Sequence, residues 1–182
     1  ADIQQPFHDA CVHLDYRMVE DTNGANPAGI GVWPSNNLDG WRMSAAITHL
    51  HPRRHCLNLT VRGNVFVRRV LFKAKKAVGV EVESGGEIFT VEAERVVLSA
   101  GAIKSPYILM LSGIGQQAQL AQWGIPLVHE LPGVGENLWN HLAAQITFKV
   151  KDGKSLVTGI ETARYSLHYT SSGSDEINDM LL

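Results

Sequence analysis

Apolar residues near the start of the chain recur at intervals of three and four positions, the spacing of one face of an α-helix. This pattern predicts a helix over residues 6–19, carried by Phe7, Ala10, Cys11, Leu14 and Met18. Residues 42–50 form a second predicted helix, which Pro52 should end because proline lacks a backbone N–H. Between the two helices, residues 26–40 are rich in Gly, Pro and Asn and hold one short predicted strand at 30–33.

The middle of the chain has short runs of β-branched and aromatic residues, which favour strands. The segments between these runs, such as Gly85-Gly86, are short enough for hairpin turns. The pattern therefore predicts a meander of antiparallel strands at residues 57–61, 65–72, 77–84 and 87–92.

Residues 95–101 are apolar without alternation and end in the small residues Ser99-Ala100-Gly101. Such a run is typical of a strand buried on both faces that leads into a tight turn. The following helix should begin with Ser105 as its N-cap and Pro106 at its first position, where the missing N–H costs nothing. We expect Ser112-Gly113 to end that helix.

The rest of the chain alternates between helical and β-prone patterns. The sequence predicts a helix at 116–123, with Gly124 as its left-handed C-cap, and a loop at 132–138. Further predicted elements are strands at 127–131 and 143–151 and a helix at 162–169. The expected fold class is therefore mixed α/β.

Composition limits the class of protein. The chain is 45% hydrophobic and 19% charged, as in globular proteins, and its net charge of −2 comes without a basic block that would bind nucleic acid. No apolar run is long enough for a membrane span, and the first residues lack the layout of a signal peptide. The two cysteines, Cys11 and Cys56, form no disulfide framework, so we expect a reducing compartment and a cytoplasmic location.

Two groups of residues are candidates for chemistry, and neither is convincing by itself. His49, His51 and His55 could suggest a metal site, but Pro52 prevents them from sharing one helical face, so no metal is expected. Residues 133–135 form a Gly-x-Gly that is not followed by a helix, so phosphate binding there is not expected either. No Gly-x-Ser-x-Gly motif is present to supply a nucleophilic serine.

A longer stretch of sequence is more specific. Residues 96–115, VVLSAGAIKSPYILMLSGIG, resemble the second signature of the glucose-methanol-choline oxidoreductases. Shorter matches occur in the same order as in that family, at 42–46, 58–61, 77–81 and 131–138. The resemblance covers roughly residues 26 to 150.

The resemblance implies part of an FAD-binding, Rossmann-like domain with an antiparallel β-meander, together with part of a substrate domain. The FAD-binding part is expected at 51–135, and residues 1–50 and 136–182 belong to the substrate domain or its connections. The implied cofactor-binding residues are Val67, whose backbone would meet the adenine ring, and the set Ser99, Ala100, Gly101 and Ser105 beside the dinucleotide.

The chain also departs from the family pattern. Trp139-Asn140-His141 stands where relatives carry Gln-Asp-His, and neither a Gly-x-Gly-x-x-Gly turn nor the C-terminal histidine segment is present. We therefore expect an internal piece of a longer enzyme that neither keeps FAD nor catalyses by itself, and we assign it no catalytic residue, His141 included.

In the whole protein, the resemblance implies hydride transfer from a small-molecule alcohol to the flavin, as in choline dehydrogenases and alcohol oxidases. Two alternatives stay open. Some relatives use this scaffold as lyases that cleave cyanohydrins, and the chain could also be a non-catalytic binding module. The sequence indicates neither the alcohol, nor the electron acceptor, nor the oligomeric state.

Overall fold

The computed structural model describes residues 3–147, 149–153 and 164–182 of the chain. The chain divides into two compact units, Ala1–Leu59 together with Gln145–Leu182, and Thr60–Ala144. We call them unit 1 and unit 2 and describe each by itself. In the described part, no helix has the length and apolar character needed to cross a membrane.

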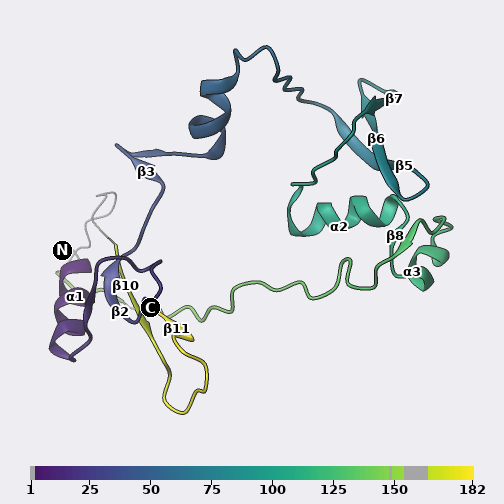
Figure 1. The fold of residues 1–182 in the computed structure, drawn as a ribbon. Coiled ribbons are helices and arrows are strands. Elements are labelled where there is room, and N and C mark those ends of the chain that lie inside the picture. The colour runs from purple at the N-terminus through teal and green to yellow at the C-terminus, as the bar shows by residue number, and fades with distance from the viewer. Residues whose placement is uncertain (1–2, 148, 154–163) are drawn as a thin grey trace. The chain divides into compact units, whose positions relative to one another are not determined.

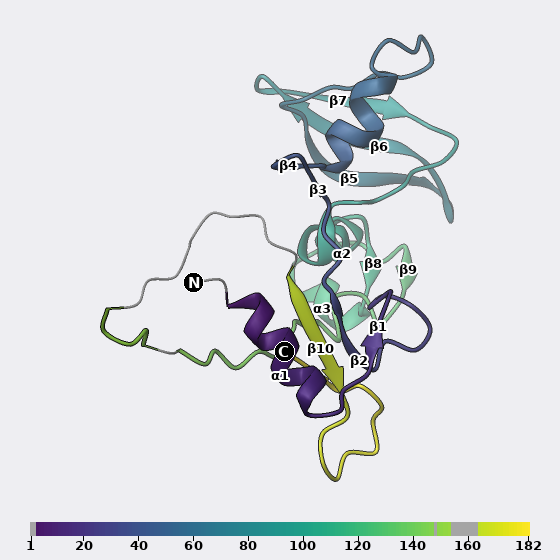
Figure 2. The ribbon, with the colours of Figure 1, turned by 90° about the vertical axis from the view of Figure 1, so that its left-hand side faces the viewer.

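Unit 1 is built on a four-stranded sheet whose strands come from both ends of the chain (Figure 1). Strand β2 (Gly29–Val32) pairs in parallel with β1 (Met18–Val19) and antiparallel with β10 (Tyr165–Tyr169), and β10 pairs antiparallel with β11 (Met180–Leu181). Helix α1 (Gln4–His13) lies along β10, as Figures 1 and 2 both show.

The core of unit 1 lies between α1 and the sheet. Cys11 of the helix packs with Ile30 of β2 and Leu167 of β10, and all three side chains are buried. Four partly buried aromatic residues pack against them, namely Phe7, Tyr16, Tyr165 and Tyr169. A hydrogen bond from the Tyr165 N–H to Gln4 Oε1, of 2.7 Å, adds a second connection between α1 and β10.

Helix α1 is shorter than the predicted 6–19. It ends at His13 because Asp15 takes a left-handed conformation, with φ of 61°, and the Tyr16 N–H donates to the Cys11 carbonyl oxygen. Met18, which the helical spacing included, instead begins β1. The predicted strand at 30–33 is confirmed as β2.

The predicted helix at 162–169 is wrong. Residues 165–169 are strand β10, and residues 162–163 lie outside the described residues. The segment can form a strand because β2 supplies a long-range partner for it, with Leu167 opposite Ile30. The predicted strand at 143–151 is also wrong for the residues described there, which have no regular structure.

The remaining elements of unit 1 are short. Strands β3 (Asn37–Leu38) and β4 (Trp41–Arg42) form a small hairpin, followed by a π-helical turn, η1 (Ala46–Leu50), and a 3₁₀ turn, η2 (His51–Arg53). Pro52 lies inside the 3₁₀ turn, near its start, where its missing N–H is tolerated, so it does not end the helical segment as predicted. The predicted strand at 57–61 does not form.

Unit 2 contains the predicted meander. Strands β5 (Phe66–Lys73), β6 (Lys76–Ser84) and β7 (Glu87–Glu92) pair antiparallel in chain order. The turn between β6 and β7 is Gly85-Gly86, and both glycines have positive φ, as the tight hairpin turn requires. Three of the four strands predicted for the meander are therefore confirmed.

The second half of unit 2 is helical. Helix α2 (Gly101–Leu111) packs against β5, and α3 (Gln117–Gln122) lies between β8 (Ile114–Gly115) and β9 (His129–Glu130) in the chain, two short strands that pair in parallel (Figure 1). The buried apolar side chains of this unit are Val70, Val82, Ile108 and Leu120. The fold class is thus mixed α/β, as predicted.

Two predictions for unit 2 need correction. Residues 95–100 form no strand, and Val97 is 78% exposed, because none of the described strands pairs with this segment. Helix α2 begins at Gly101, four positions before the predicted N-cap Ser105. In contrast, Gly113 and Gly124 follow α2 and α3 with positive φ, as expected of helix ends.

Candidate cofactor-binding site

Val67, the residue expected to meet the adenine ring, lies in β5 opposite Val82 and is half-buried. The pairing between β5 and β6 shifts by one residue directly after it, between Val67 and Arg69. Arg68 is therefore the extra residue of a β-bulge, which bends the strand and interrupts its regular ladder of hydrogen bonds.

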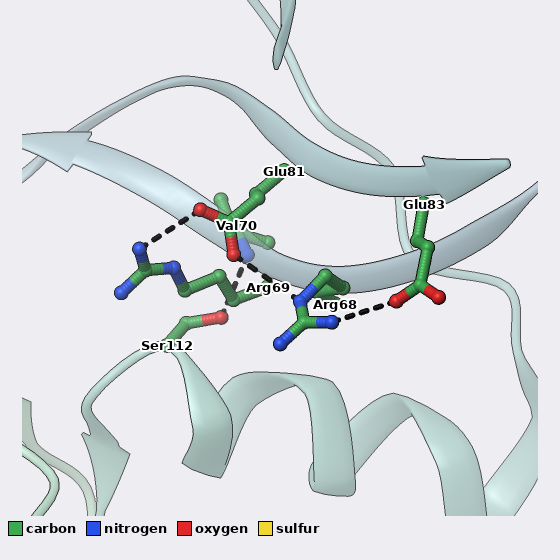
Figure 3. A network of polar contacts seen from close by, with 6 residues as sticks. All are labelled: Arg68, Arg69, Val70, Glu81, Glu83 and Ser112. Atoms are coloured by element: carbon green, nitrogen blue, oxygen red, sulfur yellow. Dashed lines mark hydrogen bonds and ion pairs between the residues drawn. The ribbon is translucent and has the colours of Figure 1, made fainter. Parts of the chain in front are cut away.

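The bulge brings two consecutive arginines toward the acidic residues of β6 (Figure 3). Arg68 Nη1 lies 2.7 Å from Glu83 Oε2, and Arg69 Nη2 lies 2.9 Å from Glu81 Oε2. In a regular strand, neighbouring side chains point to opposite faces of the sheet, whereas Glu81 and Glu83 are two positions apart in β6 and lie on one face. The bulge explains why both arginines reach that face. The hydrogen bond from Arg69 lowers the pKa of Glu81.

Ser112 joins β5 to α2. Its Oγ accepts a hydrogen bond of 2.8 Å from the Val70 N–H (Figure 3). It also donates one of 2.6 Å to the carbonyl oxygen of Ile108, one turn earlier in the chain. The residue is only 6% exposed. This buried hydroxyl therefore has a partner both as donor and as acceptor.

The predicted set of small residues lies at the start of α2. Ser99 and Ala100 precede the helix, Gly101 is its first residue, and all three are exposed. Ser105 is half-buried inside the helix, where its Oγ accepts a hydrogen bond of 3.0 Å from the Ala100 N–H. Ser105 thus holds the backbone of Ala100, directly before the helix, in place, although it is not the N-cap.

Gly101 has φ of +84°, a backbone conformation that residues other than glycine rarely adopt. A Cβ built on it would meet no atom within 4 Å, so the space beside this backbone is open. An open backbone with small neighbours is suited to close approach by a ligand, and the nearby N-terminus of α2 favours a negatively charged group.

A hollow of about 540 Å³ lies beside α2. Its walls are mostly apolar and come from α2 and from the loop after β9, namely Ala102, Ile103, Pro106, Met110 and residues 135–139. Residues 132–138 were predicted as a loop and belong to one of the shorter family matches, but they were not predicted to line a hollow. The amide of Asn137 and the carboxyl group of Glu136 are the polar side chains in its lining.

The structure brings together some of the predicted residues. Ala100 and Ser105 are joined by a hydrogen bond, and Val67 lies on a separate strand whose sheet packs against α2. Ser112 and the bulge at Arg68 were missed. The Ser-Gly pair at 112–113 was interpreted only as a helix end, and nothing in the alternation of β5 marks the extra residue.

The histidines do not form a metal site in the part of the chain that the structure describes, where no group of three His, Cys, Asp or Glu side chains could hold a metal ion. His49 Nδ1 lies 2.6 Å from Thr48 Oγ1. His141 is exposed in an irregular segment.

The fold is mixed α/β, with an antiparallel β-meander packed against a helix that begins at an open glycine backbone. A family profile described as GMC oxidoreductase matches residues 2–143, and the chain belongs to this family. The chain is 40% identical over 161 residues to oxygen-dependent choline dehydrogenase of Staphylococcus aureus strains MSSA476 and JH9. The matched region covers 88% of this chain and 28% of each relative.

Solved structures agree with this family. Pyridoxine 4-oxidase from Mesorbium loti matches with a TM-score of 0.68 and 30% identity, over 72% of this chain and 26% of its own. An FAD-dependent oxidoreductase from Chaetomium thermophilum matches with a TM-score of 0.65 and 28% identity, over 71% of this chain and 23% of its own. These likenesses support the predicted fold class. The chain thus spans about a quarter of the length of its relatives.

Proposed function

We propose that this chain is the FAD-contacting part of a flavin-dependent oxidoreductase that acts on the CH–OH group of an alcohol, similar to choline dehydrogenase. Bound FAD would accept the hydride that the alcohol carbon loses. The observation that carries the proposal is the open backbone at Gly101, which has positive φ and small neighbours within the stretch that resembles the family signature.

In this proposal, the residues of the chain bind and orient the cofactor. The backbone of Val67 contacts the adenine, while Ser99, Ala100 and Gly101 allow the dinucleotide to approach closely. Ser105 keeps the Ala100 N–H engaged and so fixes the path of these residues. We assign no group to proton abstraction, because nothing in this chain matches the histidine segment that serves as acid and base in the family.

The dinucleotide should not stay with this chain alone. The Gly-x-Gly-x-x-Gly turn that would hold the pyrophosphate is absent from the sequence. The purified 182-residue chain should therefore be colourless, whereas a full-length protein that contains it should carry FAD. Visible flavin absorbance from the isolated chain would contradict this.

A pair of glycine substitutions in the full-length protein tests the site. Gly101→Val should abolish FAD binding, because its side chain would occupy the open space beside the proposed dinucleotide. Gly124→Val is the matched control, because Gly124 also has positive φ, +65°, and open space, but follows α3. The control should keep its FAD. Full flavin content in purified Gly101→Val protein would show that the cofactor assignment is wrong.

Flavin reduction separates the remaining alternatives. Bleaching of the flavin absorbance when choline or another alcohol is added without oxygen supports the oxidoreductase. Cleavage of a cyanohydrin without bleaching would support a lyase, and a full-length protein without flavin would support a binding module. A cytoplasmic location is part of the proposal, and the free thiols of Cys11 and Cys56 support it.

A further inference from the structure

Strand β5 lies at the edge of its three-stranded sheet, so the backbone groups on its outer side have no neighbouring strand. The Val70 N–H nevertheless has a partner, because Ser112 Oγ accepts its hydrogen bond at 2.8 Å. Both residues are buried, so water cannot replace this bond if the hydroxyl is removed. A single side chain therefore takes the place of the missing strand at this point.

The orientation of that hydroxyl is fixed by its second bond. Ser112 Oγ donates to the Ile108 carbonyl oxygen at 2.6 Å, within the last turn of α2. Because the hydroxyl hydrogen is used in this bond, the oxygen meets Val70 as an acceptor, and Figure 3 shows the resulting Ser112–Val70 hydrogen bond. Alanine cannot replace either bond, while threonine carries the same hydroxyl.

The two elements joined in this way are those that carry the proposed cofactor contacts. Val70 is three residues beyond Val67 in β5, and Ser112 directly follows the helix that begins with Gly101. The bulge at Arg68 interrupts the ladder to β6 directly after Val67, so the packing of β5 against α2 also helps to hold this part of the strand in place.

We infer that Ser112 is a positioning residue for FAD, which fixes β5 against α2 so that the adenine and dinucleotide contacts form together. This inference rests on the proposed function. Ser112 does not touch the reacting atoms in this account, so it should affect the affinity for FAD and not the turnover of the loaded enzyme.

The test compares the affinity for FAD between variants of the full-length protein that lose similar stability. The flavin is first removed, and the Kd is then measured by titration with FAD. Ser112→Ala should raise the Kd for FAD by about tenfold, because the two elements lose their shared hydrogen bond. Its kcat at saturating FAD should equal that of the wild type. Ser112→Thr should restore the wild-type Kd.

Two controls separate positioning from general destabilisation. Leu120→Ala removes a fully buried side chain of α3 in the same unit and should lower the thermal midpoint at least as much, but leave the Kd unchanged. Ser166→Ala removes a buried hydroxyl that has no hydrogen-bond partner among the described residues, and it should change neither quantity.

The inference is wrong if Ser112→Ala binds FAD like the wild type, or if Leu120→Ala weakens FAD to the same extent. If Ser112→Ala does not fold, Ser112→Cys decides: its weaker hydrogen bonds should raise the Kd, and an unchanged Kd overturns the inference. The two failures can be told apart. If the wild-type protein takes up no FAD, the proposed function is wrong. If the wild type binds FAD and Ser112→Ala has the same Kd, only the role of Ser112 is wrong.

Discussion

The two larger sheets among the described residues are assembled in opposite ways. In unit 2, β5, β6 and β7 follow one another through tight hairpins, and every neighbour in the sheet is also a neighbour in the chain. In unit 1, β2 pairs with β10 from the far end of the chain, and the bond from Tyr165 to Gln4 spans 161 positions. Pairing between strands that are close in sequence costs little loop-closure entropy. The folding of unit 2 should therefore depend far less on the rest of the chain than the folding of unit 1 does.

Truncation after residue 144 should give the largest difference between the units. The deletion removes β10 and β11, so β2 loses its antiparallel partner and the core loses Leu167. Hydrogen exchange should then show unprotected amides in α1 and β2 but native protection in β5 to β7. Equal protection of β2 before and after truncation would mean that β10 does not hold unit 1 together.

Single core truncations should affect the units separately. Ile30→Ala removes a fully buried side chain of unit 1 and should cost about 2 to 5 kcal/mol there, with no loss of protection in unit 2. Leu120→Ala should have the reverse effect. Denaturant titrations of the 182-residue chain, followed residue by residue, measure both. A common loss in both units after either change would show that they unfold as one.

The helix ends of unit 2 offer a smaller contrast. Gly113→Ala should cost about 1 to 3 kcal/mol, because φ is +83° and the new Cβ would press on the Pro126 carbonyl oxygen. Gly124→Ala has a similar backbone but open space around it, so it should cost only roughly 1 kcal/mol. Thermal midpoints compare the two, and equal losses would show that crowding at Gly113 is relieved by small shifts.

The ion pairs on β5 and β6 should have the smallest effect. The hydrogen bond from Arg69 lowers the pKa of Glu81 below the ordinary 4.5, so the pair stabilises unit 2 above that pH and its contribution is lost as the pH falls through the lowered pKa. Glu81→Gln should remove this pH-dependent part while changing the thermal midpoint little at pH 7. The difference between wild type and Glu81→Gln should be the same at pH 7 and pH 3 if the pair contributes nothing.

The contrast between the units also explains which elements could be predicted. Three of the four strands predicted for the meander, the Gly85-Gly86 turn and the glycines after α2 and α3 depend on residues close in sequence, and the sequence predicted them correctly. Strand β10 was predicted as a helix because its partner β2 lies more than a hundred residues away, and periodicity within a short segment cannot identify such a partner.

For the candidate site, the sequence by itself determined the family and the position of the small residues at 99–101, because both depend on a contiguous motif. Only the tertiary structure decided that α2 begins at Gly101, that Arg68 is an extra residue in β5, and that Ser112 binds Val70. A bulge is defined by the register of two strands, and the Ser112 bond joins positions 42 residues apart. Such features arise from contacts between elements, which the order of residues within either element does not contain.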